Sequence, residues 1–399
     1  MTEIMIPINY QQIHVRIKEI GAGAQERRKK IEERRAQARA LLRAYASELD
    51  FLRAKADSAK AADANIRCAI PLNEPLASSH PARGPVTDAT LIAADGSQIN
   101  PDRHATIQFC LVNVGAISMK LNSGEAPEIF TDSELLYGDD LLPNGIPMSD
   151  GMVALRRDLA ERTKLDELSK GIKGNIVTFT DGPIELWGAK GEDANAYAEF
   201  VGKYLTILSR LQSRGVITAG YVDKPSADLV VRLLEIAMAD NEQIQKLREF
   251  HPLRGVSDRW LFGEKENPLL PPGHRSAVFG IQSSSEKNYK GVLSLHFFYL
   301  NVGAQGHPWP VRVEIPKWVA DDKEKLDLLH GVLVEQCRVM GSKPYPYLLH
   351  RAHETAVVKM EEKQQIEQLL TMELRRNNED VDDGSYKQSA KDLQGRTRR

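Results

Sequence analysis

The chain of 399 residues is predicted to be an α/β protein with a mixed β-sheet flanked by helices. Short apolar runs rich in Val, Ile and Phe alternate with amphipathic segments of helical length, as in α/β sheets. Two of these runs finish in an Asp-Gly pair, at Asp95 and Asp181. Hydrophobic residues make up 42% of the sequence and charged residues 27%, which is ordinary globular usage.

Residues 1–66 are predicted to form a long helical arm. From about Ile13 to Ala62 the sequence is rich in Ala, Arg, Lys and Glu and contains no proline, which favours one exposed helix. Its apolar positions follow alternating steps of four and three, so a partner helix is expected, as in a coiled coil. These positions are Ala38, Leu42, Tyr45, Leu49, Leu52, Ala56 and Ala59. The segment from Arg16 to Lys60 contains 13 Lys or Arg and 7 Asp or Glu. This basic excess indicates either a solvated helix face or an arm that binds along a phosphate backbone.

The main domain is predicted over residues 87–376, after a proline-rich linker at 67–86. Residues 90–94 are predicted to form a short strand that runs into Asp95, and residues 106–119 a second strand that could lie beside it. A helix over 152–168 and a buried strand over 175–180 follow, and that strand ends at Asp181.

The second half of this domain is expected to continue the alternation of helices and strands. A helix is predicted to start after an N-cap at Ser226 and to run to about Met238. In the last predicted strand, Val311, Val313 and Ile315 alternate with Arg312 and Glu314. Helices are expected at 194–211, 323–340 and 353–376, and strands at 216–222, 277–282, 293–301 and 310–315. Residues 240–275 are predicted to be a variable insertion and residues 377–399 a disordered tail.

Charge and cysteine content limit the class of protein. A net charge of −2 argues against a uniformly basic nucleic-acid coat but leaves room for a local positive stripe. The three cysteines, Cys68, Cys110 and Cys337, form no CxxC pair, so neither a disulfide framework nor a zinc ribbon is expected. A cytoplasmic protein fits best, because no export signal or membrane-spanning window is seen.

Asp95 and Asp181 are the candidate catalytic residues. The carboxyl ends of strands form the site edge in open α/β sheets, and a glycine beside the acid allows a metal or substrate to approach. Two adjacent carboxylates raise each other's pKa unless a divalent cation lies between them. Such oxygen ligands select Mg²⁺ or Mn²⁺, which suit phosphodiester hydrolysis. Each Asp-Gly pair taken alone is equally compatible with a tight turn after a strand.

Three motifs occur in an order that resembles the NurA nucleases. They are Ala94-Asp95-Gly96-Ser97, Thr180-Asp181-Gly182-Pro183, and Tyr345-Pro346 followed by Ala352-His353. Weaker matches lie between them, at 220–225, 273–276 and 312–316. The resemblance spans about Leu91 to Val358, most of the chain.

This resemblance implies a ribonuclease-H-like fold and a site that favours Mn²⁺, or Mg²⁺ in its place. It also implies a single-strand endonuclease and 5′–3′ exonuclease activity on DNA, in end processing or in defence against foreign DNA. The partners that it implies are a HerA-type hexameric ATPase and a second copy of the chain.

The resemblance also suggests which side chains hold the metal. Asp95 and Asp181 match the metal-binding acids, and Glu161 is chosen as the glutamate of the preceding helix. Asp158 and Glu167 remain alternatives for that third acid, because an acid on a surface helix is ordinarily just solvated.

Three further residues are candidates. His353 could bind metal or phosphate and Tyr345 could orient a scissile group, although a histidine that starts a helix is often a cap and Tyr-Pro an ordinary turn. Lys224 could neutralise phosphate charge or could be a surface lysine.

Two other functions compete with the nuclease. The chain could be a catalytically inert adaptor that docks on the ATPase ring. It could also be a phosphohydrolase of the haloacid dehalogenase type, but that chemistry usually needs a second acid two residues after the aspartate. Ser97 and Pro183 stand at those places, so this possibility ranks lower.

Overall fold

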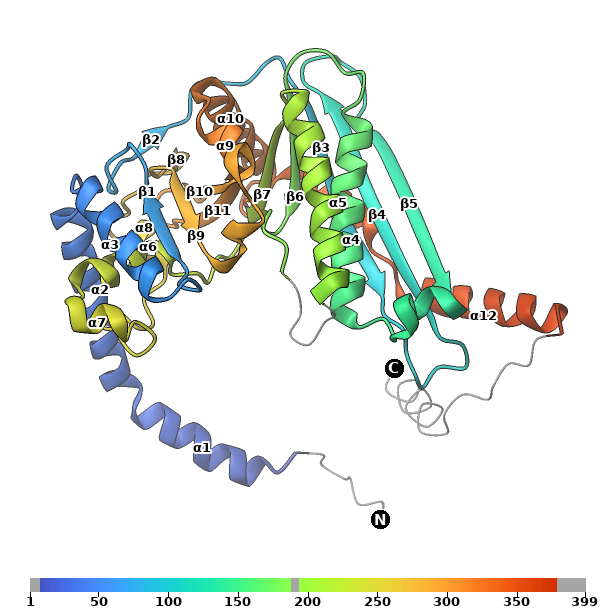
Figure 1. The fold of residues 1–399 in the computed structure, drawn as a ribbon, viewed down its shortest axis with the longest axis horizontal. Helices are drawn as coiled ribbons and strands as arrows, with labels where there is room; N and C mark the ends of the chain where they lie inside the picture. Colours follow the sequence, from blue (N-terminus) through green and yellow to red (C-terminus); the bar gives the residue numbers. More distant parts are fainter. Residues whose placement is uncertain (1–7, 188–193, 379–399) are drawn as a thin grey trace.

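The computed structural model describes residues 8–187 and 194–378 and confirms a mixed sheet flanked by helices (Figure 1). Five strands form the part of the sheet that carries the candidate site: β3 (Thr90–Ile99), β4 (Phe109–Lys120), β5 (Glu128–Tyr137), β6 (Ile176–Asp181) and β7 (Ile217–Val222). They lie in the order β5-β4-β3-β6-β7. β4 is antiparallel to both neighbours, whereas β3, β6 and β7 are parallel. This order, with its antiparallel second strand, is that of ribonuclease-H-like proteins.

The other half of the sheet is antiparallel and continues from β7. Its strands are β11 (Pro310–Pro316), β10 (Leu295–Asn301), β9 (Phe279–Gln282) and β1 (Cys68–Pro71), with β2 (His80–Pro81) and β8 (His274–Arg275) at the side. The segment expected to be a linker therefore contributes β1 and β2 to the sheet.

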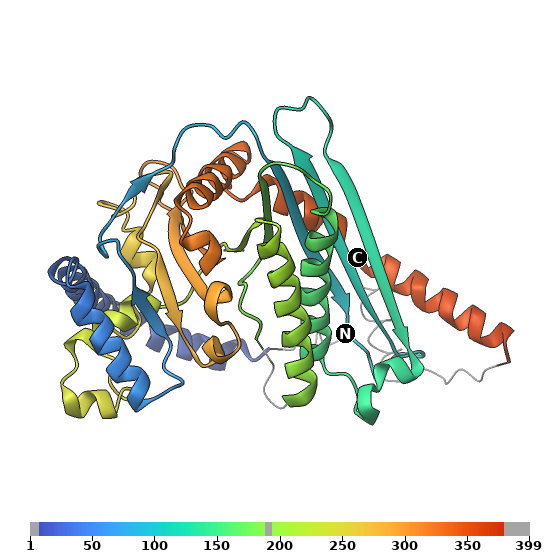
Figure 2. The same cartoon turned by 45° about the horizontal axis from the view of Figure 1, so that its top comes forward.

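Helices cover both faces of the part that carries the site (Figures 1 and 2). α4 (Asp150–Leu168) packs on β3 and β4 from one side and α5 (Ala194–Ser213) packs on α4, while α11 (Tyr347–Ala356) packs on the same two strands from the other side. Because both faces are covered, β6 is a nearly continuous buried apolar run. The remaining C-terminal helices are α9 (Lys317–Ala320), α10 (Lys323–Val339) and α12 (Met360–Arg376).

The expected single long arm helix is wrong, because the structure divides it into three helices. These are α1 (Tyr10–Ala22), α2 (Ala24–Ala44) and α3 (Leu49–Ala62). Of the seven seam positions, five are buried in the main core: Ala38, Leu42, Leu52, Ala56 and Ala59. The seam packs on β1 and α6 (Leu229–Met238) of the same chain. The partner helix implied by the spacing thus lies within the chain itself.

The expected N-cap at Ser226 is also wrong. α6 begins at Leu229, and its first amides donate to the carboxylate of Asp258, from Val230 N and Val231 N at 2.8 Å each. Asp258 belongs to the segment expected to be an insertion, which holds α7 (Asn241–Gln245) and α8 (Asp258–Phe262). A distant carboxylate has replaced the local cap, which no short-range pattern reveals.

Other element boundaries differ from the expectations in instructive ways. β3 does not end at Asp95 but continues to Ile99, because β4 pairs with it along its whole length. β5 was not expected, since most of its residues are exposed. The segment 353–376 forms two helices, so His353 lies inside α11 rather than at a helix start. Most of the expected disordered tail, from residue 379 onward, lies outside the described residues. Short 3₁₀ turns complete the fold at 138–141, 143–145, 284–287 and 291–293.

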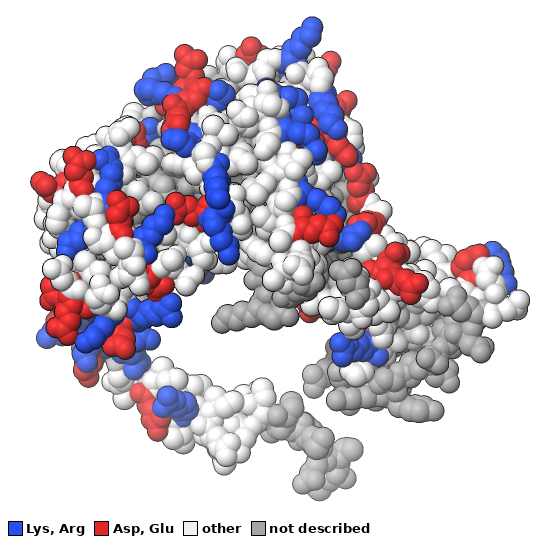
Figure 3. All heavy atoms as spheres, in the orientation of Figure 1, with Lys and Arg blue, Asp and Glu red and all other residues white. Residues whose placement is uncertain are grey.

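Two further features bear on the class of protein. All three cysteines are buried and unpaired. No described helix combines the length and the apolar character that crossing a membrane requires. On the face shown in Figure 3, Lys and Arg are interspersed with Asp and Glu, in keeping with the small net charge.

Candidate active site

Asp95 and Asp181 lie beside each other on two neighbouring parallel strands. Ala94 pairs with Thr180, so the next residue of each strand is one of the two aspartates. Desolvation and the negative charge of Asp95 raise the pKa of Asp181 above its ordinary value. The structure therefore brings together the two acids on which the sequence analysis depends.

A glycine opposite Asp95 lets α11 approach the sheet. Asp95 pairs with Gly115 of β4, and a Cβ at Gly115 would lie 2.6 Å from the backbone of Ala352 and of Ala356. No larger residue fits there. The close approach brings His353 Nδ1 to 2.7 Å from Asp95 Oδ2, so the expected histidine meets the expected acid.

Hydrogen bonds from the sheet fix the end of α11. Ser97 Oγ and Asn113 Nδ2 both donate to the carbonyl of Ala356. Ser97 follows Asp95 by two residues and therefore lies on the same face of β3. The serine of the Asp-Gly-Ser motif thus holds the helix that carries His353.

The turn after β6 depends on two glycines. Gly182 has φ of +86°, a conformation that favours glycine, and its N–H donates to the Tyr221 carbonyl at 2.8 Å. A Cβ at Gly220 would lie 2.6 Å from the carbonyl oxygen of Gly182. The glycine after Asp181 thus serves the turn, and the glycine in β7 lets that turn pack down on the sheet.

A buried ion pair in β11 holds the segment after this turn against the sheet. Glu314 is fully buried, lies 2.9 Å from Arg312 Nη2, and accepts hydrogen bonds from Ile184 N and Glu185 N at 3.0 and 3.4 Å. The predicted strand at 310–315 is confirmed as β11, and all seven residues of β11 are buried between β7 and β10. The alternation of charged and apolar residues therefore marks two buried faces.

Tyr345 lies against Asp181. It donates a hydrogen bond that lowers the pKa of Asp181, and its ring packs edge-on against Tyr221 with centroids 5.5 Å apart. Burial and then the charges of Asp181 and Asp95 raise the pKa of Tyr345, so its hydroxyl stays protonated and available as a donor.

Asp223 is a site residue that the sequence analysis missed. It follows β7, the third parallel strand, and its charge contributes to the raised pKa of both Asp181 and Tyr345. Trp309 Nε1 donates to Asp223 Oδ1 at 3.0 Å. The signal was an aspartate after a strand in the motif at 220–225, where no glycine follows the acid. Its neighbour Lys224 is exposed and makes no hydrogen bond or ion pair among the described residues.

Glu161 approaches from the opposite face of β3. A Cβ at Gly96 would lie 2.7 Å from Glu161 Oε1, so the glycine after Asp95 makes room for the buried glutamate. Because side chains alternate along a strand, Asp95 faces α11 while Gly96 faces α4. Desolvation, then the charges of Asp158 and Asp95, raise the pKa of Glu161.

The two alternatives to Glu161 differ in position. Asp158 lies near it on α4 and pairs with Arg157 Nη2 at 2.8 Å, and Arg157 Nε also lies 3.5 Å from Glu161. Glu167 is exposed and lies 3.8 Å from Lys164. The geometry therefore favours Glu161 or Asp158 over Glu167 as a partner of Asp95.

The carboxylate oxygens of the site suit a hard divalent cation, although they do not surround a single ion position. Three carboxylates, two of them with raised pKa values, supply oxygen ligands and mutual repulsion that a cation would relieve. Among the described residues, however, no three His, Cys, Asp or Glu side chains are placed to hold one ion. Asp95 accepts a hydrogen bond from His353, and Asp181 accepts one from Tyr345.

The fold and this acidic edge define a protein of the ribonuclease-H-like nuclease class. The NurA domain family matches residues 89–358, and the chain belongs to that family. The resemblance seen in the motifs is thereby confirmed.

Solved structures similar to the chain include nucleases from several organisms. The NurA nuclease of Sulfolobus solfataricus aligns at 12% identity over 75% of this chain and 88% of its own, with a TM-score of 0.47. Endonuclease V of Ciona intestinalis, in complex with a DNA 24-mer, aligns at 12% identity over 69% and 87%, with a TM-score of 0.30. The catalytic domain of human endonuclease V gives 12%, 70% and 84%, with a TM-score of 0.31. No curated protein matches in sequence.

Proposed function

We propose that the chain hydrolyses phosphodiester bonds of DNA with the help of Mn²⁺ or Mg²⁺. The observation that carries this proposal is the placement of Asp95 and Asp181 at adjacent positions of two parallel strands, with Asp223 and Glu161 near them. Repulsion among these acids is stored in the folded protein, and a bound cation would remove it.

In this mechanism Asp95 and Asp181 would hold the cation, and either Glu161 or Asp158 would reach it past Gly96, from the other face of β3. When bound, the ion would supply a Lewis acid and lower the pKa of a coordinated water. His353 is 60% exposed beside Asp95, so it can reach a phosphate oxygen or receive a proton. Tyr345 stays protonated and can donate a hydrogen bond to a substrate oxygen.

The basic groups near the acids have distinct tasks. Arg157 neutralises Asp158 and Glu161 in the absence of a cation. Lys224 follows Asp223 and has no partner among the described residues, so it is free to meet a phosphate.

Family membership supports the finer parts of the proposal. They are single-strand endonuclease and 5′–3′ exonuclease activity, action as a homodimer with a HerA-type hexameric ATPase, and a cytoplasmic role in DNA end processing or defence against foreign DNA.

The test compares wild-type protein with Asp95→Asn on an end-labelled single-stranded oligonucleotide in Mn²⁺, in Mg²⁺ and in EDTA. Cleavage is expected in Mn²⁺ or Mg²⁺ only, and Asp95→Asn is expected to lose about 10³-fold in rate, several kcal/mol of transition-state stabilisation. Asp88→Asn is the matched control, because Asp88 is exposed at the other end of the same strand. Full cleavage by Asp95→Asn would refute the proposal.

The second candidate is an inert adaptor on the ATPase ring. The same assay separates the two functions when the ATPase is included. An adaptor would leave DNA intact in every metal, with and without the ATPase.

A further inference from the structure

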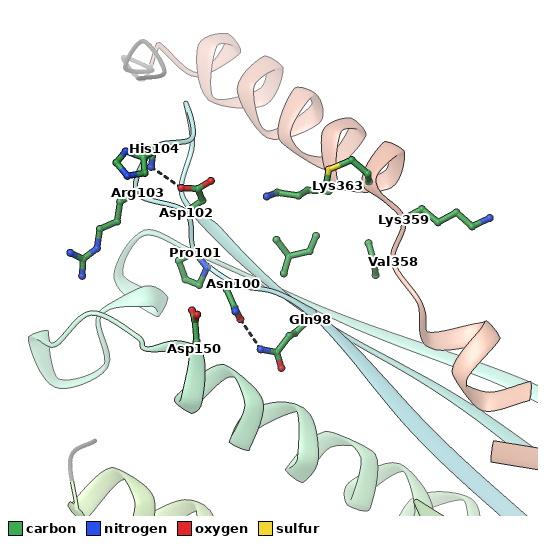
Figure 4. Close-up of a pocket in the computed structure, with 12 residues that line it drawn as sticks. Gln98, Asn100, Pro101, Asp102, Arg103, His104, Asp150, Val358, Lys359 and Lys363 are labelled. Carbon is green, nitrogen blue, oxygen red and sulfur yellow. Dashed lines mark hydrogen bonds between the residues drawn. The ribbon is translucent and has the colours of Figure 1, made fainter. Parts of the chain in front are cut away.

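A pocket lies beyond the acids, where β3 leaves the sheet (Figure 4). It has a volume of about 620 Å³. Its walls come from the end of β3 and the following loop, from the first residue of α4, and from the start of α12. The lining residues are Gln98, Ile99, Asn100, Pro101, Asp102, Arg103, His104, Asp150, Val358, Lys359, Met360 and Lys363.

The cations of this pocket are free of acidic partners. Arg103, Lys359 and Lys363 form no ion pair among the described residues, and Arg103 and Lys359 are exposed. Two acids, Asp102 and Asp150, also line the pocket. Asp102 already accepts a hydrogen bond from the backbone of His104 at 2.9 Å.

Two helix N-termini add to the positive character of the pocket. α4 begins at Asp150 and α12 begins at Met360, so two helices of 19 and 17 residues both start at its wall. Unpaired N–H groups at a helix start favour an anion. Two acids stand in the first turn of α12, and one of them, Glu362, accepts from the N–H of Lys359. The free lysine side chains remain available.

One polar atom in the wall lacks a partner. Gln98 Oε1 is buried and accepts no hydrogen bond in the described part of the chain, while Gln98 Nε2 donates to Asn100 Oδ1 at 2.7 Å. Buried acceptors are normally satisfied. The pocket therefore offers cations for an anion, whereas Gln98 Oε1 is enclosed by the protein.

A single strand of the sheet links this pocket to the acids. Gln98 and Asn100 follow Asp95 by three and five residues in the chain, and β3 is extended through Ile99. At about 3.3 Å per residue, the pocket begins roughly 10–16 Å from Asp95. A nucleic-acid strand bound at the acids would reach it within a few nucleotides.

We propose that this pocket is a phosphate-binding subsite that holds the substrate DNA strand a few nucleotides from the bond that is cleaved. The proposal rests on the proposed function, since it names where the same substrate is gripped. Lys359 and Lys363 contact the phosphates, and the exposed Arg103 lies at the open side of the pocket.

The test measures the binding of a single-stranded oligonucleotide by fluorescence anisotropy, with all proteins in an Asp95→Asn background and no divalent metal. The pocket variant is Lys359→Gln/Lys363→Gln. Loss of two phosphate contacts should weaken binding about tenfold at 0.15 M salt and reduce the slope of log K against log salt by about 1.4. Lys359→Arg/Lys363→Arg should restore both values.

The matched control is Lys120→Gln/Lys173→Gln. Both lysines are exposed and make no ion pair among the described residues, and they lie at the opposite end of β3, since Lys120 pairs with Thr90. If the pocket variant binds with the affinity and salt slope of the control, the subsite proposal is overturned.

The source of the phosphate is resolved by comparing oligonucleotides with a 5′-phosphate and with a 5′-hydroxyl, each labelled at the 3′ end. An equal loss for both supports internal phosphodiesters as the ligand. A loss confined to the 5′-phosphorylated strand supports a terminal phosphate.

Turnover separates failure of the subsite from failure of the nuclease, with Asp95 intact. Bis(p-nitrophenyl) phosphate is too short to reach the pocket, so the pocket variant should hydrolyse it at the wild-type rate while it cleaves the oligonucleotide more slowly. If wild-type protein cleaves neither substrate, the proposed function fails, whereas the binding comparison still decides the subsite.

Discussion

Acidic side chains serve opposite purposes in two neighbouring regions of the sheet. At the edge of β3 and β6, Asp95 and Asp181 lie at adjacent strand positions, and each accepts from one side chain, His353 or Tyr345, and from the N–H of the glycine that follows it. Around α8 and β11, Asp258 and Glu314 are fully buried. Asp258 accepts from two backbone amides and from the Tyr299 hydroxyl, and Glu314 accepts from two backbone amides beside Arg312.

The difference shows how to separate a structural acid from a functional one. A buried carboxylate that accepts from backbone amides holds those segments of the chain in place and is closed to a ligand. A carboxylate placed beside another acid and open to solvent repels its neighbour until a cation or substrate arrives. Burial alone does not separate the two, because Glu161 is as buried as many structural acids.

The largest expected effect comes from Asp181→Asn, which tests the functional side of the comparison. Nuclease activity in Mn²⁺ should fall about 10³-fold, because a charged ligand is lost. The free energy of unfolding should stay within about 0.5 kcal/mol of wild type or rise, because repulsion with Asp95 disappears. Rates on single-stranded DNA and urea unfolding without metal measure the two quantities. A variant that loses stability and keeps its activity would make Asp181 a structural residue.

The second prediction tests the structural side through the buried pair of β11. Glu314→Ala should lower the free energy of unfolding by about 3 kcal/mol, because it leaves Arg312 buried without its partner. The double variant Arg312→Met/Glu314→Met should lose less than the single one, since it removes both charges. Urea unfolding of the three proteins checks this order. Equal losses in the single and double variants would show that Glu314 stabilises the fold through its hydrogen bonds with the amides of Ile184 and Glu185, and not through its ion pair with Arg312.

Much of the fold could be predicted because apolar periodicity reflects local geometry. β6, β7, α4 and α10 lie within a few residues of their expected bounds. β5 could not be predicted because most of its residues are exposed at the sheet edge and its apolar residues do not alternate with polar ones. The partner of the arm could not be located, because the spacing of apolar residues does not say whether a partner helix is near or distant. In the structure, the seam of 38–59 packs on α6 and β1 of its own chain.

The site could be predicted only in part, for reasons of topology. The two Asp-Gly pairs end apolar runs, and parallel pairing brings such ends together, so Asp95 and Asp181 could be inferred. Asp223 was missed because its neighbour is Lys224 rather than glycine. The contact of His353 with Asp95 depends on Gly115, an unremarked glycine in the middle of a strand, which becomes meaningful only when α11 is seen to lie on it.

The last prediction concerns pH and tests whether the hydrogen-bond donors around Asp258 offset its burial. Burial raises the pKa of Asp258 from 3.8 to about 7 despite its three donors. The folded protein therefore holds this proton more tightly than the unfolded chain does. The resulting stabilisation is complete below about pH 4 and is lost as pH rises to about 7. Relative to Asp258→Asn, wild type should lose up to about 1.4 kcal/mol of unfolding free energy per pH unit in this window.

Urea unfolding of both proteins at several pH values between 4 and 8 measures this difference, in which the titration of all other groups cancels. The curve should level off above pH 7, where Asp258 is ionised in both states. A flat difference across the window would show that the three donors fully offset the burial of Asp258. The boundary between structural and functional acids would then depend on donors alone, without any contribution from desolvation.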